Sequence, residues 1–273
     1  MSEDHFYDAI VSWIYSIPTY MVAVIFIAGL IGIGFIANHL VPRWLRPQHL
    51  EDIETNSAIS LYAQTISVAY GLLIGLVAVA CWDNFIAVKN LISAETASIG
   101  MFYRLSYGIS DPSAVALRAS VIDYLDAIVL TDWPSLAVGD ACDAGFSYVN
   151  DLRDKLMNLT VSSSKEEAIY GKLLDSYEEL TKERQLRVNS ALDLGVPDVF
   201  WIVILLGGFF TTVMNSFIRI PSEMTRAMML TIYSLVLGLM YFLIAVIDNP
   251  FRGEVHVSSG PYINLRNELS RDR

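Results

Sequence analysis

Residues 59–82 read ISLYAQTISVAYGLLIGLVAVACW, an apolar run in which no residue is charged. A helix of about 20 apolar residues crosses the hydrocarbon core of a bilayer, and this run is long enough to do so. Three further apolar runs occupy roughly Tyr20–Leu40, Pro197–Phe217 and Ala227–Ile247, and the one charged residue in them, Asp198, lies at an end. Buried helices of soluble proteins rarely stay free of charge over such lengths, and 54% of the chain is hydrophobic. The sequence therefore predicts an all-α membrane protein with four transmembrane helices.

The four runs form two pairs around a long polar insert, residues 83–196. The insert is expected to be helical throughout, because its apolar residues recur every three or four positions. Asp111 is the expected N-cap of one helix, Ser164 with Glu167 forms the expected capping box of another, and turns are expected at 108–112 and 132–139. The predicted segments are 1–18, an interfacial N-terminal segment; 19–82, transmembrane helices 1 and 2; 83–196, the helical extramembrane insert; 197–247, transmembrane helices 3 and 4; and 248–273, a C-terminal tail.

Two helices are expected to continue from the membrane into the insert. After the second run no helix-breaking residue comes before Gly108, apart from Gly100. The segment EELTKERQLRVNSALDLGVPDVFW, residues 178–201, leads into the third run and contains Pro197, which we expect to form a kink. The sequence thus predicts long helices that project from the bilayer.

Small and polar residues form a stripe along one face of residues 59–82, at spacings of three and four. In lipid such a face lets helices pack closely, and it can equally line a water-filled pore. A similar stripe on the fourth run favours the pore, because a simple anchor needs none, but both uses stay open. The candidate pore-lining or helix-packing residues are Ser60, Gln64, Ser67, Gly71 and Gly75 in the second run and Thr231, Ser234 and Gly238 in the fourth.

The residue content excludes several classes of function. No Asp, Glu, Lys or Arg lies in the middle of an apolar run, which favours a passive conduit over a coupled transporter. The four histidines have no metal-ligand spacing and no catalytic motif is present, so we expect no enzyme, no cofactor and no metal site. The net charge is −11, and the insert has 17 acidic residues against 10 basic ones, a net charge of −7. Nucleic acid is therefore not an expected partner.

The stretch VIDNPFRG, residues 246–253, ends the fourth helix where the chain leaves the membrane. Pro250 lacks an N–H and disfavours helix at the residue before it, and Phe251 is expected at the membrane interface. Charged residues near the exits from the membrane would form a ring at a pore mouth that attracts cations, or would neutralise each other in structural ion pairs. These pore-mouth candidates are Asp83, Glu95, Arg104, Asp248 and Arg252.

Arginines beside the short connections indicate an orientation. Arg43 and Arg46 follow the first run, and Arg219 and Arg226 lie between the third and fourth. The positive-inside rule places both connections in the cytoplasm, so the insert faces outward. The arginines in residues 252–273 argue for the opposite orientation.

Several short motifs together resemble a known family. They are Trp82, Glu95, YR at 103–104, DWP at 132–134, VPDVFW at 196–201 and DNPFRG at 248–253. By their order and spacing, from about residue 59 to residue 262, the chain resembles the bestrophin-like bacterial membrane proteins, a family of unassigned function. The resemblance implies a multi-pass protein of the bacterial inner membrane. The positions that it marks are Trp82, Glu95, Tyr103, Arg104, Trp133, Pro134, Asp248, Pro250, Phe251 and Gly253.

The similarity to true bestrophins is looser and lies in the plan of the chain. Those proteins are pentameric ion channels with four membrane helices and a large helical extramembrane part between the second and third. This similarity implies a symmetric homo-oligomer, with a pentamer as the family's example. The chain has no aromatic neck triplet and no acidic calcium-binding run, so calcium gating and anion selectivity are not implied.

The expected function is an oligomeric passive ion channel, whose partners are copies of itself, the lipid bilayer and inorganic ions. An acidic insert raises the local concentration of cations, so cations are expected to be slightly favoured. The alternative is a non-conducting membrane scaffold or stress-sensing protein whose helical insert binds a partner.

Overall fold

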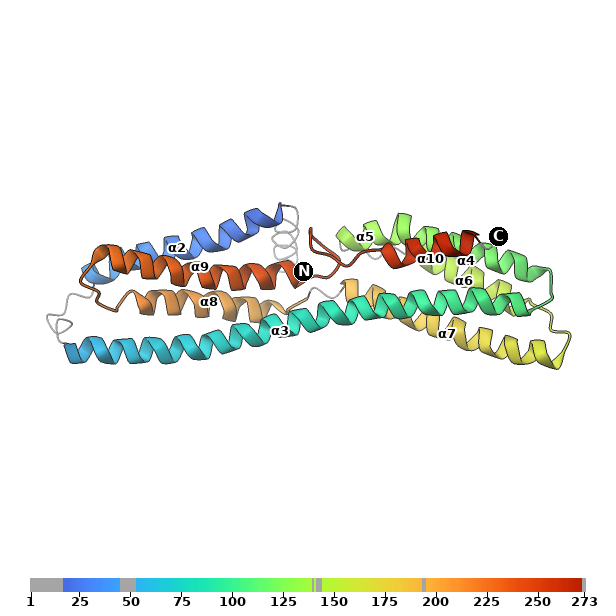
Figure 1. The fold of residues 1–273 in the computed structure, drawn as a ribbon, viewed down its shortest axis with the longest axis horizontal. Coiled ribbons are helices and arrows are strands. Elements are labelled where there is room, and N and C mark those ends of the chain that lie inside the picture. The colour runs from blue at the N-terminus through green and yellow to red at the C-terminus, as the bar shows by residue number, and fades with distance from the viewer. Residues whose placement is uncertain (1–16, 45–52, 139, 141–143, 193–194, 272–273) are drawn as a thin grey trace, which may run out of the picture. The chain divides into compact units, whose positions relative to one another are not determined.

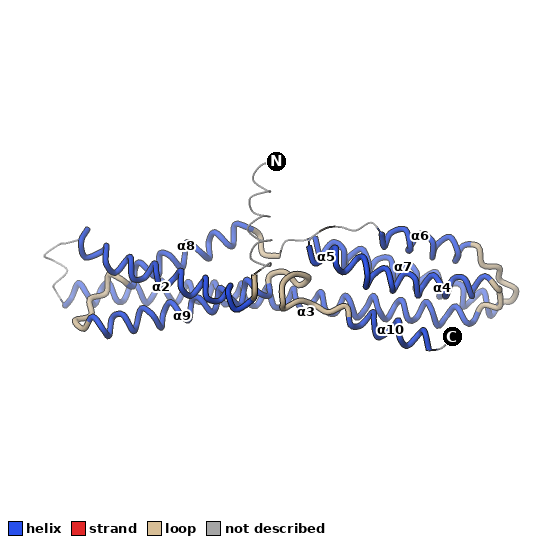
Figure 2. Tube along the Cα trace, turned by 90° about the horizontal axis from the view of Figure 1, so that it is seen from above, coloured by secondary structure: helices blue, strands red, loops and turns tan. Residues whose placement is uncertain are grey.

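The computed structural model describes residues 17–44, 53–138, 140, 144–192 and 195–271. All regular structure in these residues is helical, as Figure 2 shows, which confirms the predicted all-α class. The chain divides into two compact units. We call residues 1–83 with 195–248 the apolar unit, and residues 84–194 with 249–273 the insert unit.

One helix, α3 (Ile53–Leu105), begins in the apolar unit and ends in the insert unit (Figure 1). The prediction that the second run continues into the insert is therefore confirmed. No proline interrupts the helix, and its glycines are isolated among good helix formers. A short 3₁₀ turn, η2 (Ser106–Gly108), ends it close to the predicted turn.

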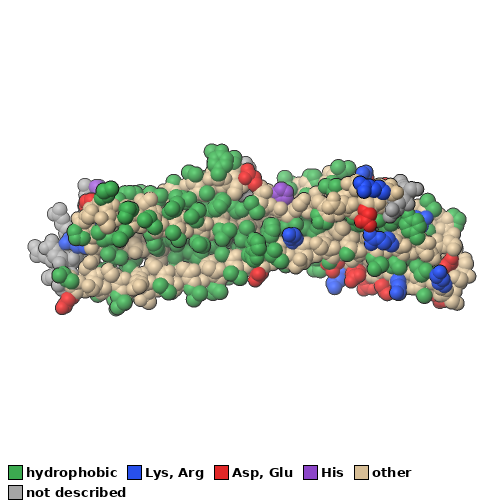
Figure 3. Space-filling model, in the orientation of Figure 1, with side chains coloured by type: hydrophobic (Ala, Val, Ile, Leu, Met, Phe, Trp, Pro, Cys, Tyr) green, Lys and Arg blue, Asp and Glu red, His purple; other side chains and the backbone are tan. Residues whose placement is uncertain are grey.

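The other helices of the apolar unit are α2 (Thr19–Trp44), α8 (Asp198–Asn215) and α9 (Glu223–Ile247). Three helical segments are long and apolar enough to cross a membrane, namely Thr19–Leu40, Ile53–Gly108 and Glu223–Ile247. The apolar helix at Val199–Asn215 is shorter. Figure 3 shows hydrophobic side chains over these helices, whereas most visible charged side chains belong to the insert unit. Three of the four predicted spans are thus confirmed by length and composition.

The small residues of α9 are used to pack this helix against α2. A Cβ added at Gly238 would lie 2.8 Å from the Ile27 Cα, so the two backbones need a glycine here. Ser234 is buried, and its Oγ donates a hydrogen bond to the Leu30 carbonyl at 3.4 Å. Close approach of this kind is how membrane helices associate when water supplies no hydrophobic driving force between them.

Two tyrosines join α3 to α8 and α9. Tyr241 on α9 donates a hydrogen bond to the Ile204 carbonyl at 2.8 Å, and Tyr70 on α3 bonds the same carbonyl. The two hydroxyl oxygens lie 2.5 Å apart. Gly208 makes room for them, because a Cβ there would overlap the Tyr241 hydroxyl. In a bilayer these polar groups have no water to bond, so their mutual hydrogen bonds hold three helices together.

The insert unit contains α4 (Ser113–Ala127), α5 (Trp133–Val138), α6 (Ala144–Met157), α7 (Ser164–Leu192) and α10 (Gly260–Arg271) besides the second part of α3. A π-helical turn, η3 (Ile128–Asp132), joins α4 directly to α5. Aromatic and aliphatic side chains such as Phe102, Leu117 and Leu180 fill one core. Helix α10 belongs to this core through Tyr262, although only a C-terminal tail was predicted at this position.

Two local predictions in the insert are wrong. The turn expected at 132–139 is helical over residues 132–138, where α5, with Pro134 as its second residue, follows directly after the π turn η3. The N-cap of α7 is Ser163, whose Oγ accepts a hydrogen bond from the Glu166 N–H at 3.2 Å, one residue before the predicted pair. Adjacent serines make the register of such a cap ambiguous in the sequence.

The kink expected at Pro197 is a break between two helices. Helix α7 ends at Leu192 and α8 begins at Asp198. Gly195 between them has a φ of +75°, a backbone conformation that favours glycine. A Cβ there would also lie 2.5 Å from the Asp248 carbonyl oxygen, so a larger residue would not fit. The predicted interfacial segment 1–18 lies outside the described residues except for its last two positions.

Candidate functional site

Glu95 on α3 and Arg187 on α7 form a buried ion pair in the insert unit. Arg187 Nε donates to Glu95 Oε2 at 2.7 Å and Nη2 donates to Oε1 at 3.3 Å, and neither side chain is exposed. Burial alone would lower the pKa of Arg187, but the negative charge of Glu95 raises this pKa well above its ordinary value. The arginine is therefore held in its charged form, in the geometry that a buried pair needs.

Two tyrosines complete the hydrogen bonding of Glu95. Tyr262 on α10 donates to Oε2 at 2.6 Å, and Tyr124 on α4 donates to Oε1 at 3.1 Å. Burial raises the pKa of both phenols well above the ordinary value, and the charge of Glu95 raises them further. Both hydroxyls therefore remain protonated donors. One carboxylate on α3 thus collects donors from α4, α7 and α10.

A second carboxylate, that of Asp132, faces the same arginine. Its Oδ2 lies 3.5 Å from Arg187 Nη2, and its Oδ1 accepts a hydrogen bond from the Gly145 N–H at 3.2 Å, at the start of α6. A Cβ on Gly145 would overlap this carboxylate. Asp132 ends the π turn η3, and π turns frequently occur at functional sites. Burial raises the pKa of Asp132, and the positive charges of Arg187 and Arg184 oppose this shift.

An aromatic cluster lies against this charged group. The Trp133 ring centroid is 5.6 Å from that of Phe251 and 5.7 Å from that of Tyr262. Phe251 is 2% exposed within the core of the insert unit, so its expected place at the membrane interface is wrong. Asn249 Oδ1 accepts a hydrogen bond from the Phe251 N–H at 3.1 Å, which folds the segment after α9 into a compact turn. Three residues of the sequence motifs, Glu95, Trp133 and Phe251, are therefore brought together.

The predicted stripe on α3 has a different environment from that on α9. Gln64 and Gly71 are exposed in the chain, and Ser60, Ser67 and Gly75 are half-exposed. By contrast, Ser234 and Gly238 on α9 are buried against α2, and Thr231 bonds the Ala227 carbonyl of its own helix at 2.8 Å. The small face of α9 is thus a packing surface, while that of α3 has no such use among the described residues.

The predicted pore-mouth residues differ in burial. Asp83 is exposed, whereas Glu95 is fully buried and does not border an aqueous opening. Asp248 is 6% exposed and accepts hydrogen bonds from the Val196 N–H at 2.7 Å and from Trp201 Nε1 at 3.2 Å. Arg252 is half-buried.

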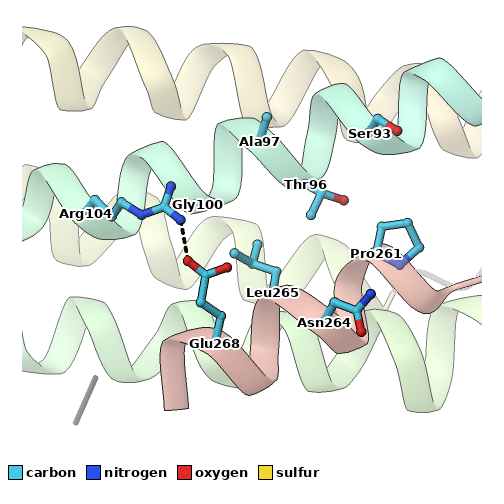
Figure 4. Close-up of a pocket in the computed structure, with 9 residues that line it drawn as sticks. All are labelled: Ser93, Thr96, Ala97, Gly100, Arg104, Pro261, Asn264, Leu265 and Glu268. Carbon is cyan, nitrogen blue, oxygen red and sulfur yellow. Dashed lines mark hydrogen bonds and ion pairs between the residues drawn. The ribbon is translucent and has the colours of Figure 1, made fainter. Parts of the chain in front are cut away.

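Arg104 pairs with Glu268 on α10 at 2.7 Å, at the end of an open groove of about 340 Å³ between α3 and α10 (Figure 4). Both of these charged side chains are more than half exposed. Apart from Arg104 at one end, the side chains that α3 contributes to the groove are small, and this leaves the groove open. The groove is lined by Ser93, Thr96, Ala97, Gly100, Arg104, Pro261, Asn264, Leu265 and Glu268.

The other motif residues have mainly structural positions. Tyr103 is buried, and its hydroxyl donates to the Leu269 carbonyl of α10 at 3.4 Å. Gly253 has a φ of +79°, which permits the turn after α9. Pro250 is buried, and its carbonyl accepts a hydrogen bond from the Val257 N–H at 2.8 Å. Trp82 and Pro134 are exposed.

A family model of the Bestrophin-like domain matches residues 28–262. The chain belongs to the bestrophin-like family. Solved structures agree with this at the level of the fold: two mutants of a bacterial bestrophin homologue from Klebsiella pneumoniae superimpose with TM-scores of 0.70 and 0.72, each at 13% identity. The matches cover 91% of this chain and 98% and 99% of those chains. A further structure, described as a membrane protein, has a TM-score of 0.69 at 12% identity over 91% of this chain and 97% of that chain. No curated protein matches the sequence.

Arg187, Tyr262, Tyr124 and Asp132 are the members of the charged cluster that sequence reasoning did not single out as site residues. A signal for the arginine was present, because the buried positions of α7 recur every three or four residues and Arg184 and Arg187 continue that stripe. Glu95 likewise falls on the buried stripe of α3, between Ile92 and Ile99. In this chain, charged residues at buried positions of α3 and α7 therefore mark the site.

Proposed function

We propose that this bestrophin-like chain is one subunit of a symmetric homo-oligomer that conducts ions passively, with the small and polar face of α3 toward the pathway. The observation that carries the proposal is the environment of Gln64, Gly71 and Gly75. A Cβ at Gly71 or Gly75 would meet nothing within 4 Å, and the Gln64 side chain is exposed. The same chain buries its other close-packing glycines, such as Gly238, against neighbouring helices.

The polar member of this face argues against lipid as its only neighbour. An amide such as that of Gln64 is costly in hydrocarbon unless it finds a hydrogen-bond partner. A neighbouring subunit or a water-filled pathway supplies such partners. The fold shared with bacterial bestrophin homologues supports the same arrangement, since α3 is the long helix common to the apolar and insert units.

We further propose that cations are slightly favoured. Asp83 is an exposed carboxylate on α3 just after the apolar stretch, and the insert has 17 acidic residues against 10 basic ones. Negative charge at the opening of a pathway raises the local concentration of cations. The proposed assembly has five subunits, as in bestrophins, lies in a bacterial inner membrane in a 2+2 arrangement of spans, and places the insert outside.

The deciding experiment measures ion flux. Purified protein in liposomes is expected to pass ions under an applied potential. Under a salt gradient, the reversal potential is expected to lie slightly nearer the equilibrium potential of the cation than that of the anion. Gly71→Leu places a large side chain on the proposed pathway or subunit contact and is expected to abolish flux or assembly. Gly29→Leu is the matched control, because Gly29 on α2 is exposed and has equally open surroundings. Vesicles of assembled wild-type protein as tight as empty ones would contradict the proposal.

The groove between α3 and α10 favours a second function, a non-conducting scaffold or stress sensor that binds a partner through its insert. Small side chains leave this groove open (Figure 4). This second function is tested by placing a photo-crosslinking residue at Ala97, which lines the groove, and crosslinking the protein in native membranes. A crosslink to a different protein, together with vesicles that carry no current, would favour the scaffold.

A further inference from the structure

The π turn η3 and helix α5 form one continuous helical stretch whose exposed side is apolar. Leu130 and Val138 are 73% and 75% exposed. Pro134 and Ala137, which lie between them, are also exposed. Residues spaced by three or four positions lie on the same side of a helix. These four side chains therefore form one surface, which we call the η3–α5 face.

The η3–α5 face differs from a helix side that faces water. In residues 127–139 the only charged residue is Asp132, and its side chain is 3% exposed. On α7 of the same unit, by contrast, the exposed residues include Lys172, Asp175 and Glu179. Such charged residues are what a solvated helix side normally has. The η3–α5 face is therefore suited to an apolar neighbour.

The chain keeps this stretch close to the end of a membrane helix. Trp133, the first residue of α5, packs against Phe251 with the two ring centroids 5.6 Å apart. Phe251 follows Asp248, the C-cap of α9, by only three positions. Three residues of chain reach at most about 11 Å. Because α9 is long and apolar enough to cross a membrane, the start of α5 is tethered near the point where the chain leaves the bilayer.

We infer that the η3–α5 face docks on the surface of the bilayer, with Leu130 and Val138 at the boundary between the headgroups and the acyl chains. Helices that lie on a membrane bury their apolar side at this depth. The four side chains of the face have no positive charge, so the docking requires no anionic lipid. It is independent of whether the protein conducts ions.

The size of the face favours lipid over a second copy of the chain. A stable protein interface buries about 800 Å² on each partner and has a polar rim. Four side chains of which none is larger than leucine supply much less area than this. Asp132 lies on the opposite, buried side of the same helical stretch, where it faces Arg187. The lipid contact and the charged cluster thus share one helix.

Photo-crosslinking of the full-length protein tests the docking. A photo-crosslinking residue is placed at Val138, and the purified protein is irradiated in liposomes of phosphatidylcholine, which has no net charge. The peptide that contains position 138 is expected to gain the mass of one phospholipid. Val115 on α4 is the matched control, because it is also a valine, is 61% exposed, and lies about 20 Å before Leu130 along the helix. Its yield of lipid adduct is expected to be several-fold lower.

Equal yields of lipid adduct at positions 138 and 115 would overturn the inference. A crosslinked dimer as the main product at position 138 would overturn it too, because the face would then be a contact between subunits. If the protein with the probe at Val138 does not fold, the probe at Leu130, on the same face, replaces it and the same outcomes decide. The adduct is read from its mass and not from ion flux, so this inference and the proposed channel function can fail separately.

Discussion

Arg187 on α7 reaches Glu95 on α3 with its Nε 2.7 Å from Oε2, at a point in the insert unit where neither side chain is exposed. Because the carboxylate also accepts hydrogen bonds from Tyr124 and Tyr262, this contact joins four helices. The lower polarity of the core makes such a pair costly to form but more costly to break, since either charge alone would remain buried.

The first prediction is that Glu95→Gln destabilises the insert unit by about 3–5 kcal/mol, because it leaves the Arg187 charge without its partner. Thermal unfolding in detergent, followed by circular dichroism, measures the effect. Glu268→Gln is the control. It breaks the Arg104 pair of the same 2.7 Å length, in which both side chains are more than half exposed. This exposed pair is expected to contribute at most about 1 kcal/mol. Equal losses in the two variants would contradict the importance of burial.

The second prediction concerns the tyrosine pair between α3 and α9. Gly208→Ala puts a methyl group where the Tyr241 hydroxyl lies, so the hydrogen bonds to the Ile204 carbonyl must move. Overpacking of this kind is expected to cost about 1–3 kcal/mol. Gly29→Ala, where a Cβ meets nothing within 4 Å, should leave the melting temperature nearly unchanged. A Gly208→Ala protein as stable as the wild type would show that the tyrosines do not bind α8 as described.

The third prediction is a pH dependence at Asp111. Its pKa lies below the ordinary value of 3.8, because the Thr160 hydroxyl and backbone and the Ser113 N–H bond its carboxylate. A depressed pKa gives stability that is present above the unfolded pKa and is lost as the pH falls through the folded one. Asp111→Asn should therefore lower the melting temperature at neutral pH. The difference from the wild type should shrink below about pH 4. A difference that is constant with pH would contradict the assignment.

The sequence predicted those features of the fold that depend on neighbours along the chain. Three of the four apolar runs are helices long enough to cross a membrane. The lack of a helix-breaking residue before Gly108, apart from Gly100, predicted that the second run continues into the insert, as α3 does to Leu105. Asp111 was expected as the N-cap of a helix; α4 instead begins at Ser113 with Pro112 at the N-cap position, and the Asp111 carboxylate, just before it, accepts a hydrogen bond from the Ser113 N–H. The resemblance to the bestrophin-like family, based on the spacing of Glu95, DWP and DNPFRG, is confirmed by the match over residues 28–262.

Features that depend on contacts between distant residues were missed. Nothing local distinguishes Arg187 from the other charged residues of α7 except its place on the apolar stripe, and its partner lies 92 positions away. The same holds for α10, whose Tyr262 bonds a carboxylate 167 positions away. Glu95 was recognised by motif and placed at a pore mouth, because an acid near a membrane exit is usually solvated. Here three donors replace the water.

The last prediction separates two acids that the sequence placed together at a pore mouth. Asp83 is exposed, whereas Asp248 is 6% exposed and accepts hydrogen bonds from the Val196 N–H and Trp201 Nε1. If the chain forms a channel, Asp83→Asn should shift the reversal potential in liposomes toward anions, because it removes one exposed charge per subunit, and should leave the melting temperature unchanged.

Asp248→Asn should do the reverse. The amide can accept only with its oxygen, so one of the two hydrogen bonds at the break between α7 and α8 is weakened, and a buried donor that loses its partner costs about 1–3 kcal/mol. The expected result is a lower melting temperature and an unchanged ratio of permeabilities in the protein that remains folded. If instead Asp248→Asn changes selectivity at full stability, the carboxylate faces the pathway in the assembly, and its hydrogen bonds to Val196 and Trp201 are exchanged for water. An unchanged reversal potential in Asp83→Asn would show that the exposed acid on α3 lies away from the ions, so cation preference would have to come from elsewhere in the acidic insert.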